Sequence, residues 1–158
     1  MYLAFAAKSY TPTRTLTTEH LAVEGEECGT PGFTVSESAR TVTEAVSSTQ
    51  TFTVVLIGDP SSDVVIDVTS SDPGEVAVSA ASLTFTSANW DTPQTITVTG
   101  VPDYLDDGNQ TSTVTLAVND GSSDNNFDLL ADQTVSVVTT DVDAAPGLEV
   151  TQTGGSTL

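Results

Sequence analysis

Hydrophobic and polar residues alternate with a period of two along the central part of the chain, which is typical of β-strands that bury one face. The alternation is clearest over residues 52–56, 64–68 and 114–118, where every second position carries Val, Ile, Leu or Phe. Turn-forming runs such as 58–62 and 70–74 separate these segments. About seven strands at this spacing, with no helical periodicity, predict an all-β protein: an antiparallel β-sandwich whose two sheets enclose the core.

The only tryptophan, Trp90, lies in a predicted loop over residues 87–93. A large aromatic side chain at the end of a sandwich usually fills the gap between the sheets. We therefore expect Trp90 to close one end of the core rather than to bind a partner.

The chain divides into three parts by its residue pattern. Residues 1–31 form an extended N-terminal arm or linker, residues 32–146 form the sandwich, and residues 147–158 form a further strand. The last segment begins Gly-Leu-Glu-Val-Thr, which has the pattern of Gly-Phe-Thr-Val-Ser at 32–36, and both segments follow a proline. This repeat predicts either the first strand of a second copy or a strand that pairs with another subunit.

Net charge narrows the range of partners. Lys and Arg number 3 against 22 Asp and Glu, which gives a formal charge of −19 at pH 7. Such a surface repels nucleic acid and anionic membranes. Acidic chains are often disordered, but 37% hydrophobic residues in a regular pattern favour a folded domain here.

The N-terminal arm offers little chemistry. His20 and Cys28 are the only residues of their types, so an intrachain disulfide is impossible and no zinc-site spacing exists. We interpret this region as a solvated acidic linker. No apolar run approaches the length that spans a bilayer, and residues 1–7 lack the basic leader of a secretion signal. We expect the chain to be part of a longer exported protein or to be exported by another route.

An acidic loop over residues 101–110 is the strongest candidate for a binding site. Asp103, Asp106 and Asp107 fall within five positions, between two predicted strands. Glu44 and the pair Asp141 and Asp143 also follow predicted strands. If these strand ends meet, their carboxylates repel one another unless a cation intervenes, and the oxygen ligands suit Ca²⁺. The alternative is that these Asp residues only stabilise turns.

Several segments resemble the Calx-beta-like repeats of large bacterial surface proteins and adhesins. They are Thr43-Glu44, residues 83–99 with Asn89-Trp90, the acidic loop, and residues 140–143. The resemblance covers about residues 32–146 and implies an immunoglobulin-like sandwich with Ca²⁺ held among loops at one end, often near the junction with the next domain.

By position, the resemblance implies seven metal ligands, of which Asp72 in the turn before residue 76 is the weakest. The seven are Glu44, Asp72, Asp103, Asp106, Asp107, Asp141 and Asp143. The sequence departs from the family where Pro102, Tyr104 and Asn109 replace frequent Asp residues, and where Ala45-Val46 replace a glycine pair. These differences imply fewer ions, weaker binding or a site no longer used.

Catalysis is not expected, because the single histidine lies in the linker and no phosphate loop or activated nucleophile is present. We predict a structural or adhesive extracellular module, stiffened by Ca²⁺, that contacts neighbouring repeats or copies of itself. One alternative is a subunit of a filament, surface layer or virus-particle decoration assembled by strand addition. Another is a Ca²⁺-dependent carbohydrate-binding module, in which the partner is a glycan or host-cell surface.

Overall fold

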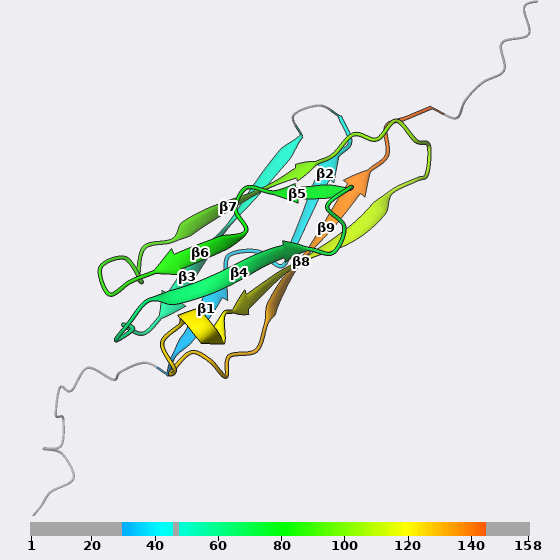
Figure 1. Ribbon diagram of the computed structural model, residues 1–158. Helices are drawn as coiled ribbons and strands as arrows, with labels where there is room; N and C mark the ends of the chain where they lie inside the picture. Colours follow the sequence, from blue (N-terminus) through cyan, green and yellow to red (C-terminus); the bar gives the residue numbers. More distant parts are fainter. Residues whose placement is uncertain (1–29, 46–47, 145–158) are drawn as a thin grey trace, which may run out of the picture.

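The computed structural model describes residues 30–45 and 48–144, which form two β-sheets packed face to face (Figure 1). One sheet has four strands in the order β1-β3-β7-β5, and the other has five in the order β2-β9-β8-β4-β6. In chain order, the strands are β1 (Gly32–Val35), β2 (Ala39–Thr43), β3 (Thr49–Ile57), β4 (Val64–Ser70), β5 (Val76–Val78), β6 (Ser82–Phe85), β7 (Gln94–Gly100), β8 (Gln110–Val118) and β9 (Gln133–Thr140). A 3-10 helix, η1 (Asp120–Ser122), precedes β9. The predicted all-β sandwich is confirmed.

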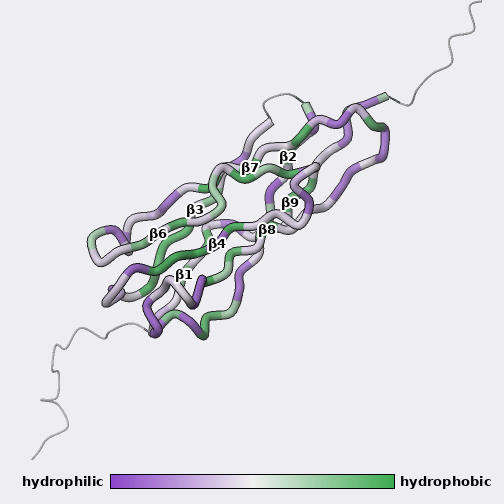
Figure 2. The backbone as a smooth tube through the Cα atoms, in the orientation of Figure 1, coloured by the Kyte–Doolittle hydropathy of each residue, from purple (hydrophilic) through white to green (hydrophobic). Residues whose placement is uncertain are grey.

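Alternate positions of the long strands supply the core, as the period of two requires. Phe52, Val54 and Leu56 of β3 are buried, and their immediate neighbours are more exposed. Figure 2 shows the result along the backbone, with hydrophobic positions concentrated on the strands and hydrophilic stretches in the connecting loops. Trp90 is half-buried against this core, as expected, and its carbonyl accepts a hydrogen bond from the Leu56 N–H at 3.1 Å.

The described residues contain nine strands rather than about seven. At the start of the sandwich, the chain crosses from one sheet to the other over residues 36–38. The strand before the crossover, β1, pairs antiparallel with β3, whereas the strand after it, β2, pairs parallel with β9. The segments β5 and β6 also join different sheets. The β2–β9 pair makes the second sheet mixed instead of purely antiparallel.

Three serines extend strand pairing past the point where a strand ends. In each case the serine N–H donates to a threonine carbonyl at 2.9 Å, and the N–H of that threonine donates to the serine hydroxyl at 2.9 Å. The pairs are Ser36 with Thr53, Ser71 with Thr113, and Ser79 with Thr97. Each hydroxyl replaces the carbonyl that an ideal ladder would supply, so the threonine N–H stays paired while the chain turns away.

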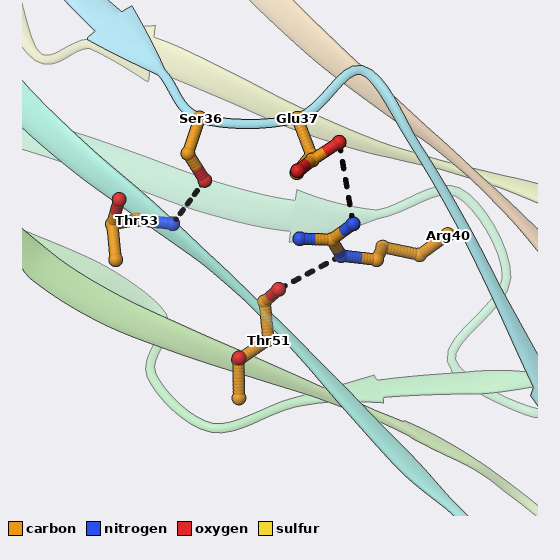
Figure 3. Close-up of polar contacts among 5 residues, drawn as sticks. All are labelled: Ser36, Glu37, Arg40, Thr51 and Thr53. Carbon is orange, nitrogen blue, oxygen red and sulfur yellow. Dashed lines mark hydrogen bonds and ion pairs between the residues drawn. The ribbon is translucent and has the colours of Figure 1, made fainter.

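Figure 3 shows the first of these pairs at the crossover between β1 and β2. In the same region the guanidinium of Arg40 donates to the Thr51 carbonyl at 2.8 Å and lies 3.4 Å from the Glu37 carboxylate. Arg40 is the only Lys or Arg among the described residues. The crossover therefore uses the single cation available to this part of the chain.

Two side-chain amides on inner strands bond to the edge strand of the opposite sheet. The Gln94 amide, on β7, donates to the Thr84 carbonyl on β6 at 2.8 Å. The Gln133 amide, on β9, donates to the Phe33 carbonyl on β1. Each bond occupies a carbonyl on an edge strand, and such groups are otherwise available for pairing with another chain.

The described chain begins at one end of the elongated sandwich and leaves at the other (Figure 1). We call the first end the N-terminal pole; it comprises residues 30–31, 58–63, 86–93 and 119–132. The second end, the C-terminal pole, comprises residues 44–45, 71–75, 101–109 and 141–144. Because β2 and β9 are parallel, their last residues, Thr43 and Thr140, lie side by side at the C-terminal pole.

The buried carboxylate of Asp124 fastens two loops together at the N-terminal pole. Its Oδ2 atom accepts hydrogen bonds from the Ser61 N–H at 2.6 Å and the Ser61 hydroxyl at 2.7 Å, with a longer one from the Ser62 N–H. Its Oδ1 atom accepts from the Asn126 N–H at 2.9 Å. These bonds, led by that of Asn126, lower the pKa of Asp124 to about 2. The adjacent Phe127 is thereby held in the core.

We expect the Asp124→Asn variant to unfold at a lower temperature than the wild type at pH 7, because the amide cannot accept all four bonds. Since the folded-state pKa lies below the ordinary 3.8, the carboxylate stabilises the fold above about pH 4 and loses this effect as the pH falls through about 2. The difference in melting temperature should therefore shrink over that range. Asp120→Asn, an exposed change in the same loop, is the control, and an equal loss in both variants would contradict the assignment.

Candidate functional site

Glu44 is a buried carboxylate at the C-terminal pole. It follows β2 directly, is 1% exposed, and neither of its carboxylate oxygens has a hydrogen-bond donor among residues 30–45 and 48–144. A buried charge without a partner is costly, and native proteins rarely keep one unless a ligand or an ion satisfies it. Glu44 is thus the residue around which the site is organised.

Two groups of three carboxylates share Glu44. One group joins it to Glu75 and Asp107, and the other joins it to Asp103 and Asp143. Within each group, one oxygen from every residue lies within 4.8 Å of the others. Ligands of one Ca²⁺ ion lie 2.3–2.6 Å from it and hence at most about 5 Å apart. Each group is compact enough to hold such an ion.

Glu75 was not among the residues predicted from sequence. It is 8% exposed and its Oε2 atom has no partner. Its carbonyl accepts hydrogen bonds from the Val101 N–H at 3.0 Å and the Thr139 hydroxyl at 3.4 Å, which fix it between the acidic loop and β9. One feature could have indicated Glu75: it lies at the end of a turn, directly before β5. The strand β5 in turn pairs with β7.

Asp72, the candidate predicted in that same turn, is exposed and belongs to neither group of three. Its carboxylate accepts a hydrogen bond from the Gly74 N–H at 2.9 Å, and its carbonyl accepts from the N–H groups of Glu75 and Val76. Its role as a metal ligand stays a prediction.

Asp141 holds the acidic loop against the segment that follows β9. Its carboxylate accepts hydrogen bonds from the Gly108 N–H and the Asp143 N–H, both at 2.8 Å. Its own N–H donates to the Asn109 side chain at 3.1 Å. The bonds from Asp143 and Gly108 lower the pKa of Asp141. We infer that Asp141 positions Asp143, while its charge also affects Asp106.

Asp106, in the acidic loop, lies beside Asp141. It is exposed as a residue, yet partial loss of contact with water, followed by the negative charge of Asp141, raises its pKa. Asp106 belongs to neither compact group. Of the seven ligands predicted from sequence, the structure places Glu44, Asp103, Asp107 and Asp143 in these groups, sets Asp106 and Asp141 next to them, and leaves Asp72 in its turn.

The site exists because the two sheets approach closely at this pole. Gly100, the last residue of β7, lies against the end of β2, and a Cβ atom there would meet the Thr43 carbonyl oxygen at 2.1 Å. The Gly100 N–H also donates to the Ser48 carbonyl at 3.1 Å. Only glycine permits this contact, which brings the residue after Thr43, the buried Glu44, next to the loop that begins after Gly100.

Negative charge is uncompensated throughout the site. Burial, followed by the charge of Asp141, raises the pKa of Glu44. Burial, followed by the charges of Asp107 and Glu44, raises the pKa of Glu75. Arg40, the single Lys or Arg in the described ranges, is occupied at the crossover.

Comparison with known proteins places the chain by its fold. A scan against protein-family models and a search of curated proteins found no match. Among solved structures, the apo-form Calx CBD1 domain is similar with a TM-score of 0.52 and 18% identity, over 72% of this chain and 98% of that domain.

Among the described residues, no helix has the length and apolar character needed to cross a membrane.

A periplasmic chaperone and a chaperone–adhesion subunit complex are also similar in structure. The periplasmic chaperone SfaE matches with a TM-score of 0.51 and 9% identity, over 70% of this chain and 58% of its own. The CsuC–CsuE chaperone–tip adhesion subunit pre-assembly complex from Acinetobacter baumannii matches at 0.53 and 7%, over 70% and 52%. The chain thus spans little more than half of these chains. At such low identity the likeness establishes the immunoglobulin-like β-sandwich fold.

In the presence of a chelator, we expect the stability of the wild type to fall as the pH rises above about 4.5. The folded state holds protons on Glu44 and Glu75 above the ordinary pKa of 4.5, so it binds more protons than the unfolded state in this range. The double variant Glu44→Gln/Glu75→Gln should lose less stability over the same interval, as measured by urea unfolding. Parallel pH profiles for the two proteins would contradict this account.

Replacing Gly100 with Ala should lower the free energy of unfolding by about 1–3 kcal/mol, the usual range for overpacking a close contact. The cause is the 2.1 Å approach to the Thr43 carbonyl, which forces the sheets apart. Gly121→Ala is the matched control, because the nearest atom to its Cβ would be the Asn119 side-chain oxygen at 3.7 Å. Urea unfolding measures both, and an unchanged Gly100→Ala variant would disprove the steric argument.

Proposed function

We propose that this protein is a structural or adhesive module of an extracellular surface assembly, and that its C-terminal pole binds Ca²⁺. The proposal is supported chiefly by Glu44, a buried carboxylate that receives no hydrogen bond from the described residues and lies among four other acidic side chains. A cation is the ligand that such a group requires. The fold supplies the rest, because rigid strands hold the bases of the loops that carry these residues.

The donor set fits Ca²⁺ better than a transition metal. All five residues of the two groups offer carboxylate oxygens, with no histidine or cysteine, and hard oxygen ligands in flexible loops suit Ca²⁺. Since the two groups share Glu44, they would hold two ions bridged by that carboxylate. Bound ions would remove the repulsion among the loops and stiffen the pole.

A non-catalytic, surface-exposed role agrees with the solved structures of similar fold. Their names describe a periplasmic chaperone, a complex of a chaperone with a tip adhesion subunit, and a Calx domain. Self-association or contact with neighbouring modules, rather than a small substrate, is the function we assign. The three-part division at residues 31 and 146, and strand addition by residues 147–158, stay predictions because the segments concerned lie outside the described residues.

Adding Ca²⁺ should raise the melting temperature of the wild type. At a free concentration one hundred times the dissociation constant, linkage gives about 2.7 kcal/mol of added stability per site. The Glu44→Gln variant should melt higher than the wild type in chelator, because the buried charge is gone, and lower than the wild type in Ca²⁺.

This reversal of order is the decisive measurement, and differential scanning calorimetry in both conditions provides it. The control is Asp59→Asn, which removes the same charge from the N-terminal pole and should follow the wild type. If Ca²⁺ shifts neither protein, or shifts Glu44→Gln as much as the wild type, the proposed site is wrong.

A further inference from the structure

The acidic loop contains an Asp-Gly dipeptide, Asp107-Gly108, and a second one, Asp120-Gly121, lies at the other pole. Glycine has no side chain to shield its backbone nitrogen, so this nitrogen can approach the carboxyl group of the preceding residue. Bond formation between the two closes a cyclic imide, and hydrolysis of the imide yields isoaspartate. Because the two dipeptides have the same residues, a difference in their reactivity comes from the fold around them.

The backbone at Gly108 is open to this reaction. Asp107 and Gly108 are both exposed, Gly108 has a φ angle of +78°, and nothing lies within 4 Å of its Cβ position. Residues 101–109 form neither a strand nor a helix. The other dipeptide lies within η1, where the Ser122 N–H donates to the Asn119 carbonyl at 2.9 Å. That closed turn restrains its backbone, whereas water and the nitrogen both reach the Asp107 side chain.

Asp141 places a base at the reacting nitrogen. The Gly108 N–H donates to the Oδ2 atom of Asp141 at 2.8 Å. Closing the ring requires the loss of this proton, and a carboxylate within hydrogen-bond distance can accept it. The Asp143 N–H donates to Oδ1 of Asp141 at 2.8 Å and holds the base in place. On the other side of the same peptide group, the Gln110 amide donates to the Asp107 carbonyl at 3.2 Å.

We propose that Asp107 is a site of spontaneous modification, which isomerises to isoaspartate with Asp141 as the base while the cation site is empty. The Gly108 nitrogen bonds to the side-chain carboxyl carbon of Asp107, and Asp141 takes the proton from that nitrogen. Asp141 then gives the proton to the departing hydroxyl, which leaves as water.

A second water molecule completes the isomerisation. It adds to the main-chain carbonyl carbon of Asp107 and breaks the bond between this carbon and the Gly108 nitrogen. The chain then continues through the former side-chain carbon, and the main-chain carboxylate is set free. One water is released and one is consumed, and nothing is oxidised or reduced.

The protection by a cation rests on the proposed function. Asp107 forms a compact group with Glu44 and Glu75. A carboxylate that coordinates Ca²⁺ is deprotonated, so it has no hydroxyl to lose. Isomerisation adds a methylene group to the main chain and moves the carboxylate directly onto the Cα atom, which changes its position relative to Glu44 and Glu75. An occupied site is therefore preserved, whereas an empty one loses a ligand with time.

Peptide mapping by mass spectrometry with electron-transfer fragmentation distinguishes isoaspartate from aspartate and tests the proposal on the full chain. The wild type is stored in chelator at pH 7, either folded or unfolded in guanidinium chloride. In the folded chain, isoaspartate should accumulate at least tenfold faster at Asp107 than at Asp120. Unfolding removes the contact with Asp141, so the rate at Asp107 should fall and the two rates should become similar. Equal rates in the folded chain, or no decrease on unfolding, would overturn the proposal.

The Asp141→Asn variant isolates the base. The side-chain oxygen of asparagine still accepts the Gly108 N–H but does not take up its proton, so the rate at Asp107 in chelator should fall at least tenfold. Asp120 in the same molecule is the internal control and should keep its wild-type rate. An unchanged rate at Asp107 would overturn the role of Asp141. If the melting temperature shows that this variant has not folded, the comparison of folded with unfolded wild type decides.

Ca²⁺ separates this inference from the proposed function. Under saturation established by calorimetric titration, Ca²⁺ should slow isomerisation at Asp107 at least tenfold and leave Asp120 unaffected. Ca²⁺ binding without isomerisation in chelator would overturn the modification and leave the cation site intact. Isomerisation in chelator without any Ca²⁺ binding would overturn the cation site and the protection, and leave the modification intact.

Discussion

Negative charge that has no counterpart in the described part of the chain is the constraint on which this structure depends. Glu44 is buried because β2 and β7 meet at the Thr43–Gly100 contact, and none of the described residues donates a hydrogen bond to its carboxylate. Burying a charge in this way lowers stability unless an external partner binds. The fold is stable at its N-terminal pole for the opposite reason, since Asp124 is buried with four donors around it. The two poles thus contain the same chemical group in contrasting states.

This contrast separates the cation site from the features that stabilise the rest of the fold. The core is formed by alternate residues of the strands and closed by Phe127 and Trp90, and the serine–threonine pairs complete the ladders. None of these features requires an ion. The proposed ion binding would act on the loops of one pole, where it would change charge and rigidity.

Much of this arrangement could be predicted from the residue pattern. The period of two located the strands, and carboxylates after strands that end together were expected to converge, as Glu44 and Asp143 do. The features that could not be predicted from the pattern are those that depend on which strands pair with each other. The assignment of β1 and β2 to different sheets follows from the crossover at residues 36–38, and the place of Glu75 follows from the register of β5 on β7. Asp72 precedes Glu75 by three residues, a distance at which turn geometry decides which carboxylate is buried.

The parallel pairing of β2 with β9 has a mechanical consequence. Both strands run from the N-terminal to the C-terminal pole, and five consecutive residues of β2, from Ala39 to Thr43, are in register with β9. A pulling force applied through the two ends of the sandwich acts along these strands in opposite directions. It therefore loads their hydrogen bonds together in shear, instead of opening them one after another. A module linked to others in a stretched fibre would resist tension best in this geometry.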